Sequence, residues 1–98
     1  SLAILKTSTF DRWLTGLKDR RAKVKINARL LVIQEGGIMM QKSLGRGLWE
    51  TRIHYGPGYR LYYVRRGQSV IVLLCGGDKS SQGRDIKTAR EVARYFDE

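Results

Sequence analysis

Cysteine, histidine and proline each occur only once in the chain, at Cys75, His54 and Pro57. A single cysteine cannot form an internal disulfide, and without a CxxC pair or a second histidine the usual ligands of a zinc site are missing. We therefore expect neither a metal nor a cofactor. Because Cys75 lies inside the apolar run VIVLLCGG, we expect it to be a buried structural thiol.

Long apolar runs are absent as well. No stretch approaches the roughly 20 apolar residues that a membrane-spanning helix needs, and the first residues show no signal-peptide pattern. We therefore expect a soluble, cytoplasmic protein without a membrane association.

Acidic residues are scarce. Nine Asp and Glu stand against nineteen Lys and Arg, which gives a formal net charge of +10 on 98 residues. Self-repulsion at that charge opposes a compact state unless a polyanion or an acidic partner covers it. Nucleic acid is the first candidate partner, an acidic protein the second and an anionic membrane surface the third.

Apolar periodicity predicts one α+β domain over residues 1–98, in the order β-α-α-β-β-β-α. The loop before the second strand is expected at residues 38–47. One side of the sheet is apolar and the other carries ionisable groups, which predicts an antiparallel sheet packed against its helices on one side only. The predicted strands are residues 2–6, 48–55, 59–65 and 69–75, and the predicted helices are residues 10–17, 21–34 and 86–96.

Ionisable side chains alternate along the predicted strand before the Gly-Pro-Gly turn. They are Glu50, Arg52 and His54. If Arg60 faces them across the hairpin and Lys79 arrives from the end of the next strand, five groups converge. Cleavage of RNA by the neighbouring 2′-OH needs a base, donors for the charge on the phosphate, and an acid for the leaving oxygen.

This cluster supplies groups for each of those roles. Glu50 or His54 would be the base, and the arginines and the lysine would bind the phosphate. A purely structural explanation competes with this one. Glu50 and Arg52 are spaced for a surface ion pair, and His54 fits an exposed surface histidine.

Further residues are candidates for binding RNA. Tyr55, Tyr59 and Tyr62 are able to stack on unpaired bases, although tyrosines in strands are also typical of core packing. The loop residues Lys42 and Arg46 are candidate phosphate contacts, or simply solvated charges. Gln82, in the polar corner after the last predicted strand, completes this group.

Three stretches, together covering most of the chain, carry a resemblance to a known family. They are FDRWLTGLKD (residues 10–19), GRGLWETRIHYGPGYRLYY (45–63) and LLCGGDKSSQGRDIKTA (73–89). In this order they resemble the RelE/ParE superfamily of toxins from type II toxin–antitoxin systems. Within it they are most similar to the HigB-like group called addiction-module killer proteins.

The resemblance implies a compact RelE-like fold and a ribosome-dependent endoribonuclease. Such an enzyme cuts mRNA in the ribosomal A site through a 2′,3′-cyclic phosphate and arrests growth. By the matching motifs it implies functional roles for Arg60 and Lys79, and for Glu50 and Arg52 on the strand before the turn. RelE itself carries lysines at those last two positions, so this chain departs from the pattern there.

The resemblance also implies partners. A small helix-turn-helix antitoxin would neutralise the toxin, and the toxin–antitoxin complex would bind operator DNA through the antitoxin. Two other functions stay open at this point. One is a ParE-like poison of DNA gyrase, and the other is a non-catalytic module that binds nucleic acid or a protein partner.

Overall fold

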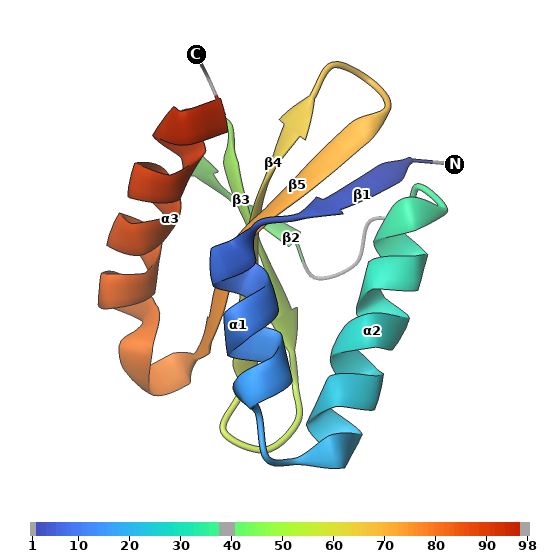
Figure 1. The fold of residues 1–98 in the computed structure, drawn as a ribbon, viewed down its shortest axis with the longest axis vertical. Coiled ribbons are helices and arrows are strands. Elements are labelled where there is room, and N and C mark those ends of the chain that lie inside the picture. Colours follow the sequence, from blue (N-terminus) through green and yellow to red (C-terminus); the bar gives the residue numbers. More distant parts are fainter. Residues whose placement is uncertain (1, 38–40, 97–98) are drawn as a thin grey trace.

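The computed structural model describes residues 2–37 and 41–96, which form an α+β domain (Figure 1). Strands and helices follow in the order β-α-α-β-β-β-β-α, with one short 3₁₀ helix, η1, before the last helix. The elements are β1 (Ala3–Lys6), α1 (Ser8–Gly16), α2 (Arg20–Gln34), β2 (Gln41–Gly45), β3 (Leu48–Ile53), β4 (Tyr59–Arg66), β5 (Val70–Asp78), η1 (Lys79–Ser81) and α3 (Gln82–Phe96).

The sheet differs from the expected one in two ways. Residues 41–45 form the edge strand β2, which pairs with β3, where we expected a loop; residues 38–40 of that loop lie outside the described residues. The strand order is β1-β5-β4-β3-β2, and β1 runs parallel to β5, so the sheet is mixed and not purely antiparallel. Long connections between two strands permit a parallel pairing.

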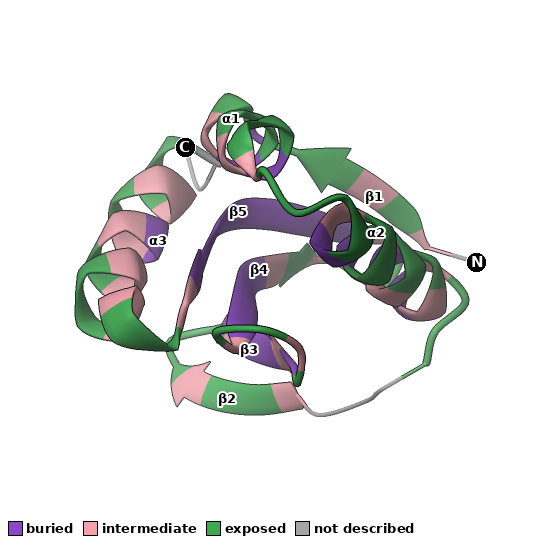
Figure 2. Ribbon diagram, turned by 90° about the horizontal axis from the view of Figure 1, so that it is seen from below, coloured by how far each residue is buried: buried purple, intermediate pink, exposed green. Residues whose placement is uncertain are grey.

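Helices cover both faces of this sheet (Figure 1, Figure 2). α1 and α2 run in opposite directions over one face, and α3 packs on the other, so the expectation of helices on one side only was wrong. The largest fully buried side chains of the first core are those of Phe10, Ile26, Leu61, Ile71 and Leu73. The second core contains Leu48, Tyr62, Val72, Leu74, Cys75 and Ala89.

Local signals in the sequence explain where the first two helices begin. The Thr7 hydroxyl accepts a hydrogen bond from the Phe10 amide and donates one to the Leu74 carbonyl, which ties the start of α1 to β5. The Asp19 carboxylate accepts from the amides of Arg21 and Ala22 at the start of α2. Such caps satisfy amides that have no partner within the helix. None of the helices in the described part is long and apolar enough to cross a membrane.

Candidate functional site

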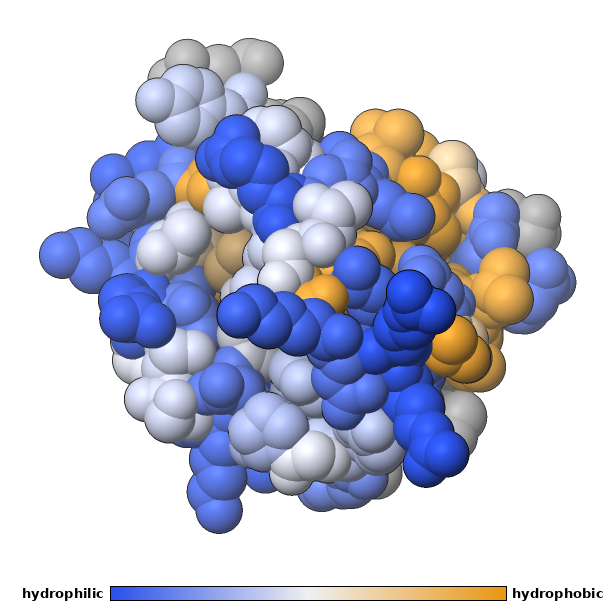
Figure 3. Space-filling model, turned by 60° about the horizontal axis from the view of Figure 1, so that its bottom comes forward, coloured by the Kyte–Doolittle hydropathy of each residue, from blue (hydrophilic) through white to orange (hydrophobic). Residues whose placement is uncertain are grey.

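The β3–β4 hairpin brings the predicted basic residues to one end of the sheet. Arg52 pairs with Arg60 across the hairpin, and Arg60 pairs in turn with Gly77 on β5. The turn that joins β3 to β4 has positive φ angles at Gly56 and Gly58 (56° and 83°), which a residue with a side chain rarely adopts. Figure 3, in which this end of the molecule comes forward, shows mostly hydrophilic side chains.

A pocket of about 170 Å³ opens at this end of the hairpin. We call it the hairpin pocket. It is lined by Arg52, Ile53, His54, Gly58, Tyr59, Arg60 and Lys79. Four of the five residues expected to do chemistry therefore share one pocket, and the fifth, Glu50, lies behind it.

Glu50 is completely buried and holds the basic residues in place. Its Oε1 accepts a hydrogen bond from Arg52 Nε at 2.9 Å, and its Oε2 accepts one from Gln82 Nε2, also at 2.9 Å. Arg60 Nε lies 3.8 Å from Oε1. Burial alone raises the pKa of Glu50, but the hydrogen bonds from Arg52 and Gln82 and the charges of both arginines outweigh burial and lower it.

These contacts bear on what we expected of Glu50 and of its hydrogen-bond partner Gln82. Glu50 is neither a surface ion pair nor a group that reaches the pocket, because both of its oxygens are engaged and none of its surface is exposed. Gln82 braces Glu50 from the first residue of α3, and its contact with RNA stays a prediction. α3 closes this face of the sheet, and the alternation within β3 alone does not reveal that.

Arg60 is buried, yet some of its hydrogen-bond donors have no acceptor among the described residues. The residue is only 7% exposed, and among the described residues nothing accepts a hydrogen bond from its Nε or Nη1. Buried donors in proteins are nearly always hydrogen-bonded to protein, to ordered water or to a ligand, so Arg60 Nε and Nη1 are available to water or to a ligand in the pocket. Because Arg60 lines the hairpin pocket, an oxyanion there is the ligand that matches these donors.

His54 and Lys79 complete the pocket from its exposed side. His54 directly follows the end of β3, and Lys79 opens η1, where both side chains are accessible to solvent. Asp78 fixes this corner, since its carboxylate accepts hydrogen bonds from the Ser80 amide and hydroxyl. Those hydrogen bonds lower the pKa of Asp78. The capping role of Asp78 was not anticipated, although an Asp two residues before a Ser is a common turn signal.

Two of the three tyrosines considered for base stacking are buried. Tyr59 and Tyr62 are 7% and 0% exposed, so the expectation that they stack on bases was wrong, because both pack in the cores. Tyr55 donates a hydrogen bond to Asp19 at 2.9 Å, and Lys25 Nζ lies 5.2 Å from the centre of its ring.

The two predicted basic contacts lie outside the hairpin pocket. Lys42 is exposed on β2, level with Glu50, and Arg46 is exposed in the turn that joins β2 to β3.

The prediction for Cys75 was confirmed, because it is buried in the second core and burial raises the pKa of its thiol to about 12. Within residues 2–37 and 41–96, no three His, Cys, Asp or Glu side chains gather to form a metal site.

The fold and this pocket define a small, strongly basic α+β domain that presents three cationic groups and an imidazole at one end of its sheet. Residues 12–95 match the family described as Phage derived protein Gp49-like (DUF891), and the chain belongs to this family. It is a toxin-like, RelE-like family. A relative from Haemophilus influenzae, an "Uncharacterized protein", is 47% identical over 94 residues, which are 96% of this chain and 95% of the relative.

Proposed function

We propose that this protein is the toxin of a type II toxin–antitoxin module, similar to HigB, and that it cleaves mRNA at the ribosome. The observation that carries the proposal is Arg60, a buried guanidinium whose Nε and Nη1 have no hydrogen-bond acceptor among the described residues, at a pocket also lined by Arg52, His54 and Lys79. Membership in the Gp49-like family supports it independently.

The cations of the hairpin pocket fit a phosphodiester. Arg60 would donate from Nε and Nη1 to the non-bridging oxygens, whose negative charge grows as the nucleophile attacks. Arg52 is half-buried, and its Nε is already committed to Glu50, so the rest of its guanidinium is left for a second oxygen. Lys79 adds a point charge from the exposed side.

His54 is the group placed for proton transfer. Glu50 is shielded, so the exposed imidazole is the base candidate that lines the pocket. In the proposed step His54 takes the proton of the ribose 2′-OH, a bond forms between O2′ and phosphorus, and the bond from phosphorus to O5′ breaks. The leaving O5′ takes a proton from the Lys79 ammonium. The products are a 2′,3′-cyclic phosphate and a 5′-hydroxyl end.

The partners follow from the same proposal. A helix-turn-helix antitoxin with an acidic segment would neutralise part of the +10 charge. The toxin–antitoxin complex would then bind operator DNA through the antitoxin. The substrate would be mRNA held in the ribosome.

Induction in growing cells tests the proposal. Arg60→Lys keeps the charge beside Glu50 but loses the two-pronged donor, and Lys79→Ala removes an exposed cation without disturbing the core. We expect wild type to arrest growth with codon-phased breaks in mRNA, and both variants to lose at least about tenfold of this activity. Arg12→Lys, on the exposed surface of α1, is the matched control and should remain toxic.

Two other results would contradict the proposal. Breaks in chromosomal DNA with intact mRNA would assign the chain to the gyrase poisons. Normal growth with intact mRNA and DNA would leave only a binding module.

A further inference from the structure

A second pocket lies at the opposite end of the same sheet, between the β2–β3 turn, the end of β4 and the last turns of α3. Its volume is about 240 Å³, and we call it the arginine pocket. Among the described residues that line it, none is acidic. Its five arginines are Arg46, Arg65, Arg66, Arg90 and Arg94.

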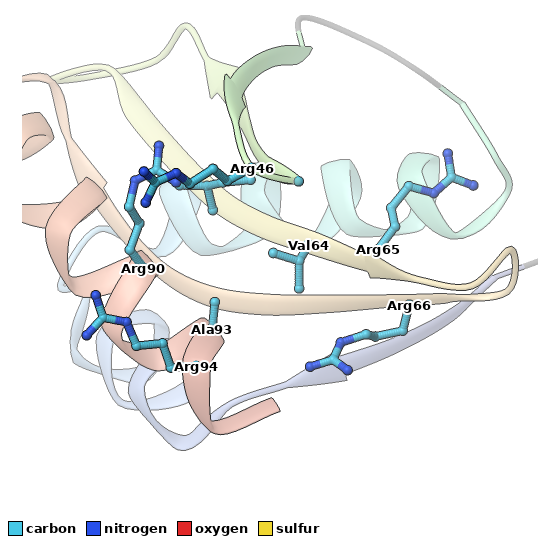
Figure 4. A pocket seen from close by; sticks show the side chains of 9 residues that line it. Arg46, Val64, Arg65, Arg66, Arg90, Ala93 and Arg94 are labelled. Carbon is cyan, nitrogen blue, oxygen red and sulfur yellow. The ribbon is translucent and has the colours of Figure 1, made fainter. Parts of the chain in front are cut away.

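Four of these arginines surround a small apolar floor (Figure 4). Arg46 and Arg90 lie together on one side of Val64 and Ala93, while Arg94 and Arg66 flank them and Arg65 points away. Arg90 is fixed, because its Nη2 donates to the Leu44 carbonyl at 2.8 Å. Arg46, Arg90 and Arg94 bring like charges together here, and like charges repel one another, so an anion bound among them is stabilised.

The backbone at Arg46 adds a second observation. Its φ is 54°, between Gly45 at 87° and Gly47 at 78°. Arg46 is the only residue other than glycine with a positive φ among the described residues. Glycine at this position would relieve the strain. An arginine held there presents its charge at the tip of the turn, beside Arg90.

An exposed lysine lies between the two pockets. Arg52 and Arg60 line the hairpin pocket, while Leu48 and Val64 line the arginine pocket, four residues further along the same two strands. That offset is about 13 Å, since a strand rises about 3.3 Å per residue. Lys42, on the edge strand β2, is level with Glu50 and so lies midway between the pockets.

We propose that the arginine pocket binds backbone phosphates of the same RNA strand whose scissile phosphate occupies the hairpin pocket. This inference rests on the proposed function. Positive groups at the two ends of β3 and β4, with Lys42 midway between them on the edge strand β2, match a chain of regularly spaced phosphates better than a single acidic side chain. A stacked strand advances about 3.4 Å per nucleotide, so the two pockets lie about four nucleotides apart. The route follows the β2 edge, because α3 covers the sheet face between the pockets.

Binding of uncleavable 2′-O-methyl RNA, followed by fluorescence anisotropy at several salt concentrations, tests this inference. The test variant is Arg46→Gly with Arg94→Ala, which removes two exposed charges, and glycine suits the backbone at position 46. The control, Arg12→Ala with Arg20→Ala, removes two exposed charges from α1 and α2 on the other side of the sheet.

We expect the test variant to bind an oligonucleotide of about ten residues more weakly, with a salt slope reduced by up to about 1.4, since each phosphate contact on a single strand contributes about 0.7. Its affinity for an oligonucleotide of about two residues, too short to reach both pockets, should match that of the control. Equal slopes for both variants on the longer strand would overturn the inference while leaving cleavage at the hairpin pocket intact. The inference would also be overturned if the test variant lost affinity only for a competing poly-glutamate and not for RNA. The pocket would then be assigned to acidic peptides. Failure of wild type to bind either RNA would also overturn the inference, whereas the proposed function fails separately, if wild type leaves mRNA on the ribosome intact.

Discussion

Replacing Glu50 by glutamine removes one negative charge and almost no volume from the centre of the site. Arg60 then keeps a buried charge whose nearest carboxylate, 3.8 Å away, has gone. At an effective dielectric of about 20, that attraction is about 4 kcal/mol. The Arg52 side chain is 36% exposed, so water replaces most of its lost contact, at about 1 kcal/mol or less.

The free energy of unfolding of Glu50→Gln should therefore fall by about 3–5 kcal/mol, the range typical of a buried ion pair that loses one partner. This is a large share of the 5–15 kcal/mol that stabilises an ordinary domain. Urea unfolding at neutral pH, with the m-value checked for two-state behaviour, measures the change. Adding Arg60→Met removes the stranded charge, so the double variant should recover much of the lost stability.

Two results, one for Glu50→Gln and one for the double variant with Arg60→Met, would contradict this prediction. A loss below about 1 kcal/mol in Glu50→Gln would show that the carboxylate is solvated and that the arginines are held by something else. Additive losses in the double variant would show that Glu50 and Arg60 do not interact.

Four further predictions concern the residues around the site. Because the pKa of folded Glu50 lies below its usual 4.5, wild type should lose stability relative to Glu50→Gln as the pH falls from about 6 to 3, in paired urea titrations. In thermal melts, Gly77→Ala should reduce the free energy of unfolding by about 1–3 kcal/mol, because the added Cβ would clash with Asp85 Oδ2. Gly83→Ala, with no atom within 4 Å, should be neutral or stabilising by up to about 1 kcal/mol in the same thermal melts. Tyr62→Phe should also be neutral or stabilising by about 1 kcal/mol in urea unfolding, because the phenol oxygen is buried without a hydrogen-bond partner among the described residues.

The helices and the hairpin are predictable from the sequence because their determinants are local. Thr7 and Asp19 cap helices a few residues away, and the Gly-Pro-Gly turn defines the β3–β4 hairpin. The pairing of Arg52 with Arg60 follows from that hairpin. These features depend on interactions within about a dozen residues.

Other features depend on contacts between distant segments. The QKSLG sequence of β2 lacks a strand pattern of its own and is extended because it pairs with β3. The burial of Glu50 requires Gln82, 32 residues later, and the packing of α3. The arginine pocket draws on Arg46, Arg66 and Arg90, which no spacing rule relates.

Cleavage in a purified translation system tests the central claim most directly. Ribosomes stalled on a defined mRNA would be mixed with wild type, Arg60→Lys or the Arg12→Lys control, and the ends of the RNA fragments would be analysed chemically. The proposed function predicts fragments with 2′,3′-cyclic phosphate and 5′-hydroxyl ends from wild type and the control, and at least about tenfold fewer from Arg60→Lys. Intact mRNA with wild type, or equal cleavage by folded Arg60→Lys, would contradict it.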